Sequence, residues 1–172
     1  MGENLDVEGR LAVRTPMQWT AERNGGFSRA RPSRLVRPVV EGPFGPEHVN
    51  VADQRRDRDS LQSFLKLLIK RYRESPELGW AQFAVLDQPH RNVLAHECAH
   101  DERRIVSLHN LAPTSCTVPL ALDGCDASYT LIDLLHEGTE YALDDRGRAE
   151  VELEGYGYRW LRVMSRDSRR LA

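Results

Sequence analysis

Two histidines and a glutamate form the short motif with the clearest chemical meaning in the sequence. His96-Glu97-Cys98-Ala99-His100 has the spacing H-E-x-x-H. On a helix this spacing puts both imidazoles on one face, where they bind zinc while the glutamate acts as a general base. However, Arg103 and Val106 stand where the longer zinc-protease pattern has Gly and His. The neighbouring residues also follow the pattern of strands, on which residues four apart lie about 13 Å from each other. We therefore expect a polar strand and turn with no bound metal, and keep a zinc hydrolase as the less favoured alternative.

Two further groups of side chains have a functional and a simpler interpretation. Tyr156, Tyr158 and Trp160 alternate along one run and would share a strand face. Such a face is able to stack on sugars, but we favour packing in the core. Four arginines lie in a proline-rich stretch and lack the interleaved aromatic residues of a single-strand nucleic-acid site. We interpret them as a solvated loop: Arg29, Arg31, Arg34 and Arg37.

Length and charge set the outer limits. The 172 residues correspond to about one domain at roughly 150 residues per domain. Lys and Arg number 24 against 26 Asp and Glu, so a polybasic nucleic-acid binder is excluded. No apolar run reaches membrane-spanning length, and the start lacks the basic and apolar regions of a signal peptide. Three cysteines without C-x-x-C spacing are expected to stay reduced. These features predict a cytoplasmic protein that binds neither nucleic acid nor membrane.

The elements that must position these residues fall into two parts. The first 50 residues hold 11 of the 21 glycines and prolines and show no sustained apolar period. So long an irregular stretch is unusual in a compact domain, and we expect loops that pack against something else. Apolar residues then recur at helical spacing from Leu61 to Tyr72, after the capping residue Ser60 and before Pro76. This pattern predicts a helix at about residues 60–74.

The remainder of the sequence predicts an antiparallel β-sandwich. Short apolar runs alternate with turn residues at the spacing typical of such folds. We expect eight strands within residues 80–86, 93–98, 105–111, 116–122, 129–135, 141–143, 149–153 and 156–163. The fold class is therefore mainly β, and the tail at residues 165–172 is expected to fray.

One segment of the irregular part is far more specific than its composition. It reads Arg14-Thr15-Pro16-Met17-Gln18-Trp19, followed after a short spacer by Asn24-Gly25-Gly26-Phe27-Ser28. This pair of motifs resembles the segment after the last barrel strand in α-glucosidases and trehalose synthases of glycoside hydrolase family 13. The predicted helix, the sequence Pro76-Glu77-Leu78-Gly79 and the closing Gly155–Trp160 segment are also similar to that family. Within it, the trehalose synthase branch is the nearest likeness.

The resemblance implies a division of the chain. Residues 1–78 would be the C-terminal remnant of a catalytic (β/α)8 barrel, with loops and one helix, and residues 79–164 its β-sandwich domain. Family members of this branch rearrange maltose to trehalose with retention, through two carboxylates about 5–5.5 Å apart. Those carboxylates lie upstream of the RTPMQW motif in the family, and no acidic residue here matches their motifs. We therefore assign no catalytic residue and expect the isolated chain to be inactive.

Few site residues carry over from the family. Arg14 matches an arginine at the mouth of the active site, where its fork of donors holds sugar hydroxyls. An equally weighted alternative is an ion pair that fixes the loop. For Gln18 and Trp19 we favour loop packing over sugar contact. The substrate-binding residue proposed is thus Arg14, and no metal ligand or cofactor is assigned. The resemblance allows calcium in full-length family members, but no ligand for it is identified in this sequence.

Three functions remain open on this basis. The first is the C-terminal segment of a trehalose synthase-like enzyme, whose partners would be maltose, trehalose or short α-glucans and an upstream catalytic portion. The second is the same segment of an α-glucosidase or α-amylase hydrolase. The third is a non-catalytic β-sandwich module that binds a glycan or a partner.

Overall fold

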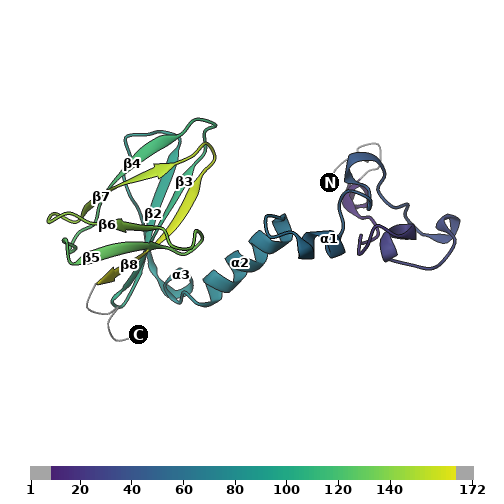
Figure 1. Cartoon of the computed structure of the whole chain (residues 1–172), viewed down its shortest axis with the longest axis horizontal. Coiled ribbons are helices and arrows are strands. Elements are labelled where there is room, and N and C mark those ends of the chain that lie inside the picture. The colour runs from purple at the N-terminus through teal and green to yellow at the C-terminus, as the bar shows by residue number, and fades with distance from the viewer. Residues whose placement is uncertain (1–8, 166–172) are drawn as a thin grey trace. The chain divides into compact units, whose positions relative to one another are not determined.

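The computed structural model describes residues 9–165, which divide into two compact units that meet between Leu67 and Leu68 (Figure 1). The expectations for the first eight residues and for the tail after Ser165 lie outside this described range. Within it, no helix has the length and apolar character that crossing a membrane needs. Each unit is described by itself below.

The first unit is built from short turns of 3-10 helix and the start of an α-helical segment. The 3-10 turns are η1 (Gly9–Val13), η2 (Arg23–Gly26), η3 (Pro32–Arg34) and η4 (Gly42–Phe44). Helix α1 (Val51–Arg56) begins at Asn50, whose side-chain oxygen accepts a hydrogen bond from the Asp53 backbone N–H at 2.9 Å. Such a cap satisfies an N–H group that the helix itself cannot pair. The predicted irregularity of this region is confirmed.

Helix α2 (Leu61–Arg73) confirms the helix expected at residues 60–74. The Ser60 hydroxyl accepts from the Ser63 backbone N–H at 3.2 Å, and basic residues occupy the last turn, where they complement the negative end of the helix dipole. The apolar stripe that predicted the helix is not buried within the chain. Leu61, Leu65 and Tyr72 expose 65%, 47% and 53% of their surface.

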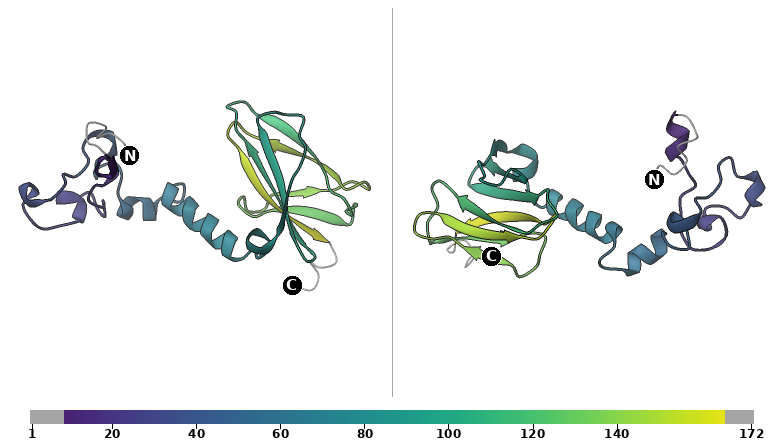
Figure 2. Two further views of the ribbon diagram at one scale, coloured as in Figure 1. Left: turned by 180° about the vertical axis from the view of Figure 1, so that it is seen from behind. Right: turned by 90° about the horizontal axis from the view of Figure 1, so that it is seen from above.

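The second unit contains the end of α2, the short helix α3 (Glu77–Trp80) and eight antiparallel strands (Figure 2). A six-stranded sheet has the order β1-β2-β3-β8-β5-β6, and β4 pairs with β7 in a second sheet. The strands are β1 (Gln82–Val85), β2 (Val93–His100), β3 (Arg103–Asn110), β4 (Cys116–Ala121), β5 (Tyr129–Asp133), β6 (Glu140–Ala142), β7 (Arg148–Leu153) and β8 (Tyr158–Ser165). The mainly β, antiparallel fold class is confirmed.

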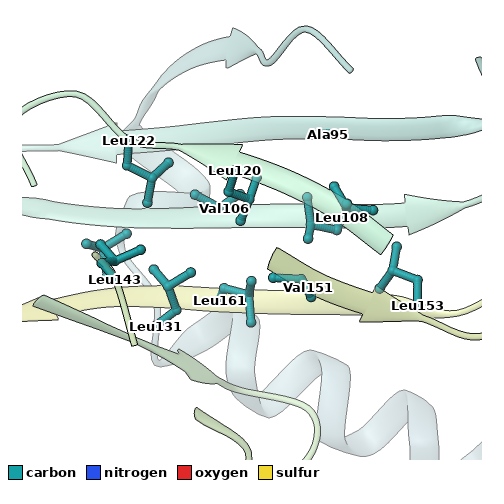
Figure 3. Close-up of a cluster of buried hydrophobic side chains, with 12 residues drawn as sticks. Ala95, Val106, Leu108, Leu120, Leu122, Leu131, Leu143, Val151, Leu153 and Leu161 are labelled. Carbon is teal, nitrogen blue, oxygen red and sulfur yellow. The ribbon is translucent and has the colours of Figure 1, made fainter. Parts of the chain in front are cut away.

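The hydrophobic core lies between the two sheets (Figure 3). Val118 and Leu120 of β4 are buried in the same apolar cluster as Val106 and Leu108 of β3 and Leu161 of β8. Each of these side chains contributes about 1.5–3 kcal/mol when it is fully removed from water. The alternation of burial along the strands follows directly from the two-residue period of a strand.

The face of β8 that enters the core differs from our expectation. Arg159, Leu161 and Val163 are buried on the core side, whereas Tyr158 and Trp160 lie on the opposite face and are half-buried. The prediction that these aromatic residues form the sandwich core is therefore wrong. Helix α3 packs against β2 and β3 and covers part of the outer face of the sheet. Large apolar side chains can therefore be partly buried on this face as well as in the core. Tyr156 precedes the strand and is 67% exposed.

Candidate functional site

The RTPMQW segment and the N-G-G-F-S segment form one loop in the first unit. The backbone N–H groups of Trp19 and Thr20 donate to the carbonyl of Gly25 at 2.7 and 3.1 Å. The loop turns at Asn24, Gly25 and Gly26, whose φ angles are 56°, 64° and 68°. Glycine is needed at the third position, because a Cβ atom on Gly26 would lie 2.5 Å from the hydroxyl oxygen of Thr20. The motif thus encodes a specific backbone geometry.

Polar side chains hold this loop from the inside. The buried Asn24 amide donates to the carbonyls of Ser28 and Ala30 at 2.7 and 2.9 Å. Gln18 donates to the carbonyls of Phe44 and Val49 at 3.0 and 2.5 Å. The expected packing role of Gln18 is confirmed by these bonds.

The same loop supports the start of helix α1. The carbonyl oxygens of Gln18 and Trp19 accept from the N–H groups of Val51 and Ala52 at 3.0 Å each. The first N–H groups of any helix lack partners within the helix and must find them elsewhere. The loop therefore fixes where α1 begins.

The remaining side chains of the loop point away from these internal contacts. Arg14 is exposed, and within residues 9–165 it forms no ion pair with a carboxylate, so the alternative of an ion pair that fixes the loop has no partner there. Trp19 is 47% exposed, which contradicts its expected burial in loop packing. Met17 and Phe27 are 49% and 52% exposed. The loop thus presents Arg14 together with three apolar side chains that no part of its own unit covers fully.

The H-E-x-x-H motif lies on strand β2 and not on a helix. His96 packs its ring on His109 of β3, with centroids 6.1 Å apart, and on Phe83 of β1 at 5.0 Å. His100 lies instead near Asp101, with Nε2 to Oδ2 at 3.7 Å. Among the described residues no three His, Cys, Asp or Glu side chains are grouped closely enough to hold a metal ion. The helix on which the zinc alternative depends is absent from this position.

Burial sets the protonation state of the two stacked histidines. Loss of water around the ring lowers the pKa of His96, and the nearby charge of His109 lowers it further. The pKa of His109 is also lowered by burial. Both rings therefore favour the neutral form, which allows two imidazoles to stack without charge repulsion.

The glutamate of the motif is committed to a different contact. Glu97 accepts a hydrogen bond from Arg104 Nε at 2.5 Å, and Arg104 Nη1 also donates to the carbonyl of Asp123 at 2.7 Å. A carboxylate paired in this way serves to anchor two strands and a loop and is a poor general base. The cysteines are free thiols, as expected, and burial raises the pKa of Cys98 and Cys125, so neither is primed as a nucleophile.

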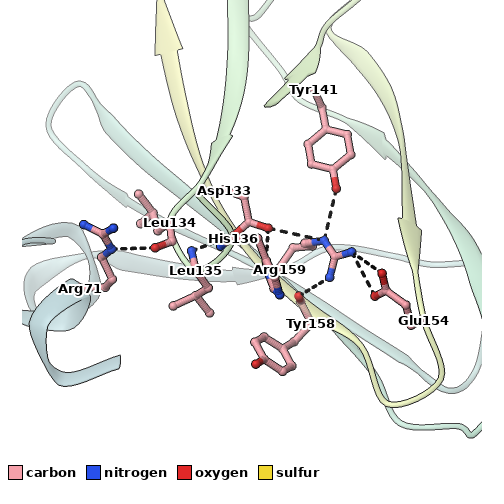
Figure 4. A network of polar contacts seen from close by, with 9 residues as sticks. All are labelled: Arg71, Asp133, Leu134, Leu135, His136, Tyr141, Glu154, Tyr158 and Arg159. Atoms are coloured by element: carbon pink, nitrogen blue, oxygen red, sulfur yellow. Dashed lines mark hydrogen bonds and ion pairs between the residues drawn. The ribbon is translucent and has the colours of Figure 1, made fainter. Parts of the chain in front are cut away.

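A polar network that the sequence did not reveal surrounds Arg159 (Figure 4). The Asp133 side chain has no exposure, and its Oδ2 lies 2.9 Å from Nδ1 of His136 and 3.5 Å from Nε of Arg159. Arg159 Nη2 donates to both carboxylate oxygens of Glu154 at 2.9 and 3.0 Å, and its Nε donates to the Tyr141 hydroxyl at 3.2 Å. The sequence holds one sign of this network. Arg159 is two and four residues from Leu161 and Val163, so the two-residue period of the strand places an arginine on the core face.

Comparison with known proteins matches both units. Residues 103–162 match the family model of the sucrose hydrolase-like C-terminal domain. The trehalose synthase/amylase TreS of Mycobacterium tuberculosis is 29% identical over 97% of this chain and 28% of its own length. The trehalose synthase of Thermus thermophilus is 36% identical over 72% of this chain and 13% of its own length. The crystal structure of the trehalulose synthase MutB from Pseudomonas mesoacidophila shares the fold, with a TM-score of 0.66 and 24% identity over 90% of this chain and 26% of that chain.

The chain belongs to glycoside hydrolase family 13. It corresponds to the C-terminal portion of the family members that it matches. It spans less than a third of the length of these relatives, 28% in the first and 13% in the second. Within family 13 it is trehalose synthase-like, and the match to the family model extends from the start of β3 into β8. The loop that carries Arg14 lies in the part that the longer alignment with the Mycobacterium tuberculosis relative covers.

Proposed function

We propose that this chain supplies the C-terminal portion of an enzyme that rearranges maltose to trehalose, and that its Arg14 contacts the sugar substrate. Residues 1–78 complete the rim and outer helix of the catalytic (β/α)8 barrel, residues 79–164 form the β-sandwich domain, and residues 165–172 form the tail. The observation that carries this proposal is the loop of the first unit. The side chains that hold the loop donate to backbone carbonyls of the same unit. Arg14 and Trp19 are exposed and remain available to a ligand or a neighbouring domain.

The chemistry of Arg14 suits this role. A guanidinium presents five N–H donors in a rigid plane, which matches adjacent hydroxyl oxygens of a pyranose or a carboxylate beside it. Trp19 lies on the same loop and is 47% exposed. Its indole supplies an apolar surface of the kind that contacts a sugar ring. The two side chains thus offer one polar and one apolar contact to a sugar substrate.

The contacts of the carboxylates in this chain support the proposal that an upstream portion supplies the catalytic carboxylates. A retaining glycosidase mechanism needs a nucleophile and an acid, both carboxyl groups, about 5–5.5 Å apart. The carboxylates that are buried or half-buried, Glu77, Glu97 and Asp133, are paired with Arg162, Arg104 and Arg159. Each is held by a cation and so is engaged in structure. We propose that the catalytic pair comes from the larger portion of the enzyme and that the isolated chain does not turn over maltose.

A chimeric enzyme tests the proposal. The matching C-terminal segment of the Mycobacterium tuberculosis relative is replaced by this chain, and maltose conversion is followed by chromatography of trehalose and glucose. We expect trehalose from the chimera and no product from the chain alone. Arg14→Ala should lower kcat/KM about 10- to 100-fold, as loss of one or two hydrogen bonds to a charged donor implies. The matched control Arg55→Ala removes an exposed arginine of α1 and should leave kcat/KM unchanged.

The products distinguish the two enzyme functions. Glucose without trehalose identifies the segment with the hydrolase alternative. A folded chimera that yields neither product, or an isolated chain that converts maltose, contradicts the proposal.

A further inference from the structure

An exposed tyrosine stands in an unusual backbone conformation at the tip of the second unit. Tyr156 has a φ angle of 57°, in the left-handed region that residues with a side chain rarely adopt, and its side chain is 67% exposed. The residues on either side must be glycine. A Cβ atom on Gly155 would overlap the carbonyl of Pro113, and one on Gly157 would lie 2.8 Å from the carboxylate of Glu154. The turn therefore fixes the backbone of Tyr156, and its side chain is directed to solvent.

The buried side chain of Asn110 makes this tip rigid. Asn110 is 2% exposed, and its amide donates to the carbonyls of Thr114 and Glu154 at 2.7 and 2.9 Å. Its side-chain oxygen accepts from the Asn92 side chain at 2.8 Å and from the Ala112 N–H at 3.0 Å. Three loops are thus fixed to one side chain. We call them the tip loops: residues 90–92, 111–115 and 154–157.

The tip loops present apolar surface together with a fixed acceptor. Leu111 is 66% exposed. The next residue, Ala112, accepts a hydrogen bond at its carbonyl from the N–H of Tyr156 at 2.8 Å, which joins the two loops. Glu154 lies two residues before the tyrosine, and its two oxygens are fixed by Nη2 of Arg159. That hydrogen bond lowers the pKa of Glu154, so the carboxylate is ionised and oriented.

The register of the sheet places the tip loops away from the helices. Strand β1 follows α3, and its first residue Gln82 pairs with Ala99 at one end of β2. The other end of β2 begins at Val93, which pairs with Asn110. The two ends are separated by about six residues, or roughly 20 Å along the strands. Tyr156 therefore stands at the end of the sandwich opposite to the one at which α2 and α3 join it.

We propose that the tip loops bind an α-glucan chain, with Tyr156 stacked on a glucosyl ring and Glu154 accepting from its hydroxyl groups. An amphipathic aromatic ring and a few fixed polar groups are the usual elements of a small-molecule site. A polyhydroxylated ligand fits because the oriented oxygens of Glu154 accept hydrogen bonds from hydroxyl donors. The choice of an α-glucan rests on the proposed function, since it takes its substrate class from that reaction. The site itself is remote from Arg14 in the sequence and needs no turnover.

Affinity electrophoresis of the full chain through gels that contain glycogen tests this site without an activity assay. We expect glycogen to slow migration, and the β-linked glucan hydroxyethylcellulose to have no effect. Tyr156→Ala should raise the apparent dissociation constant about tenfold or more, the factor that corresponds to 1.4 kcal/mol. Tyr156→Gly removes the ring and relieves the left-handed backbone, so it should lose the retardation while the melting temperature rises. This second variant separates loss of binding from loss of folding.

Trp80→Ala is the matched control, because Trp80 is a 79% exposed aromatic residue at the other end of the sheet. It should leave the retardation unchanged. Migration that glycogen does not affect, equal retardation by both glucans, or a loss that occurs in Trp80→Ala as much as in Tyr156→Ala overturns the proposal. Retardation that vanishes when a lysine-rich peptide is added at low salt, and not when maltoheptaose is added, would overturn it in favour of a basic protein ligand. Failure of the chimera above with binding intact would refute the proposed reaction and leave the site standing.

Discussion

Arg162 of β8 and Glu77 of α3 form an ion pair between residues 85 positions apart, with Nε 3.0 Å from Oε1. The Glu77 side chain has no exposure to solvent, and that of Arg162 is 28% exposed. Arg162 Nη2 also donates to the hydroxyl of Ser75 at 2.7 Å. The pair fixes α3 on the outer face of the six-stranded sheet.

Removing the cation of this pair should be severely destabilising. In Arg162→Leu the Glu77 carboxylate loses the one charged partner it has among residues 9–165 while it stays buried, and we expect a loss of about 3–5 kcal/mol in unfolding free energy. Glu77→Gln should cost less, because Arg162 keeps Ser75 and partial access to water. Urea unfolding followed by tryptophan fluorescence measures both. The exposed pair Lys70–Glu74 provides the control: Lys70→Ala should change the unfolding free energy by at most about 1 kcal/mol. Similar losses in Lys70→Ala and Arg162→Leu would contradict the expectation.

Stability of the second unit should decline as the pH falls from neutral. Burial lowers the pKa of His96 and His109 in the folded chain, so the unfolded chain binds more protons once the pH drops below about 6.5. Their contribution is fully present above that value and is lost below it. Urea midpoints at about pH 7.5 and about pH 5 should differ, and His109→Phe should reduce the difference.

The control for this prediction is His48→Phe, which changes an exposed histidine of the first unit and should preserve the pH difference. Asp126, Asp144 and Glu154 also have lowered pKa values through hydrogen bonds, but carboxylates lose such stabilisation only below about pH 4.5. A pH difference that His109→Phe leaves intact would show that other groups cause it.

A methyl group on Gly155 should disrupt the tip loops. The Cβ atom of Gly155→Ala would overlap the carbonyl of Pro113, and backbone atoms cannot move aside as a flexible side chain does. We expect a loss of about 1–3 kcal/mol in unfolding free energy. Gly79→Ala is the matched change, since its Cβ atom would meet only the Tyr72 hydroxyl at 3.7 Å. It should be neutral or slightly stabilising, because alanine favours helix. Thermal unfolding of the two variants decides the point.

Amide hydrogen exchange should distinguish the two units in the isolated chain. We expect slow exchange in β3 and β8, which are interior strands of the six-stranded sheet, and fast exchange over residues 10–50. The physical reason is the scarcity of buried apolar side chains in that segment, where Val36 is 98% and Phe27 52% exposed. Strong protection throughout residues 10–50 would show that this segment is stable without a barrel.

The sequence predicted the elements of the fold well because their periods are local. Apolar spacing located α2 to within a residue at each end, and turn residues separated all eight strands. The face of each strand that is buried depends on distant residues, and here prediction failed at β8. Tyr158 and Trp160 looked like core residues, but Leu161 and Val163 fill the core while α3 covers part of the other face. No local pattern shows that a four-residue helix will lie there.

The candidate site was predicted in outline and misjudged in detail. The motif from Arg14 to Trp19 identified the loop, yet the internal bonds of Gln18 and Asn24 depend on carbonyls up to 31 residues away. Such pairings leave no signal in a single sequence. The same holds for the tip loops, where the exposed Tyr156 is meaningful only once the positive φ angle and the bonds of Asn110 are known.

The position of Glu77 also bears on how this protein should be dissected. A shortened chain that began at Gly79, the predicted start of the β-sandwich, would keep every strand and the whole apolar core. It would nevertheless leave Arg162 without either Glu77 or Ser75 and uncover the outer face of the sheet. An expressible fragment should instead start upstream of Arg71, whose Nε donates to the carbonyl of Leu134 at 2.7 Å. The smallest fragment expected to fold alone therefore includes the last turn of α2. By sequence, that helix is assigned to the barrel portion and not to the β-sandwich.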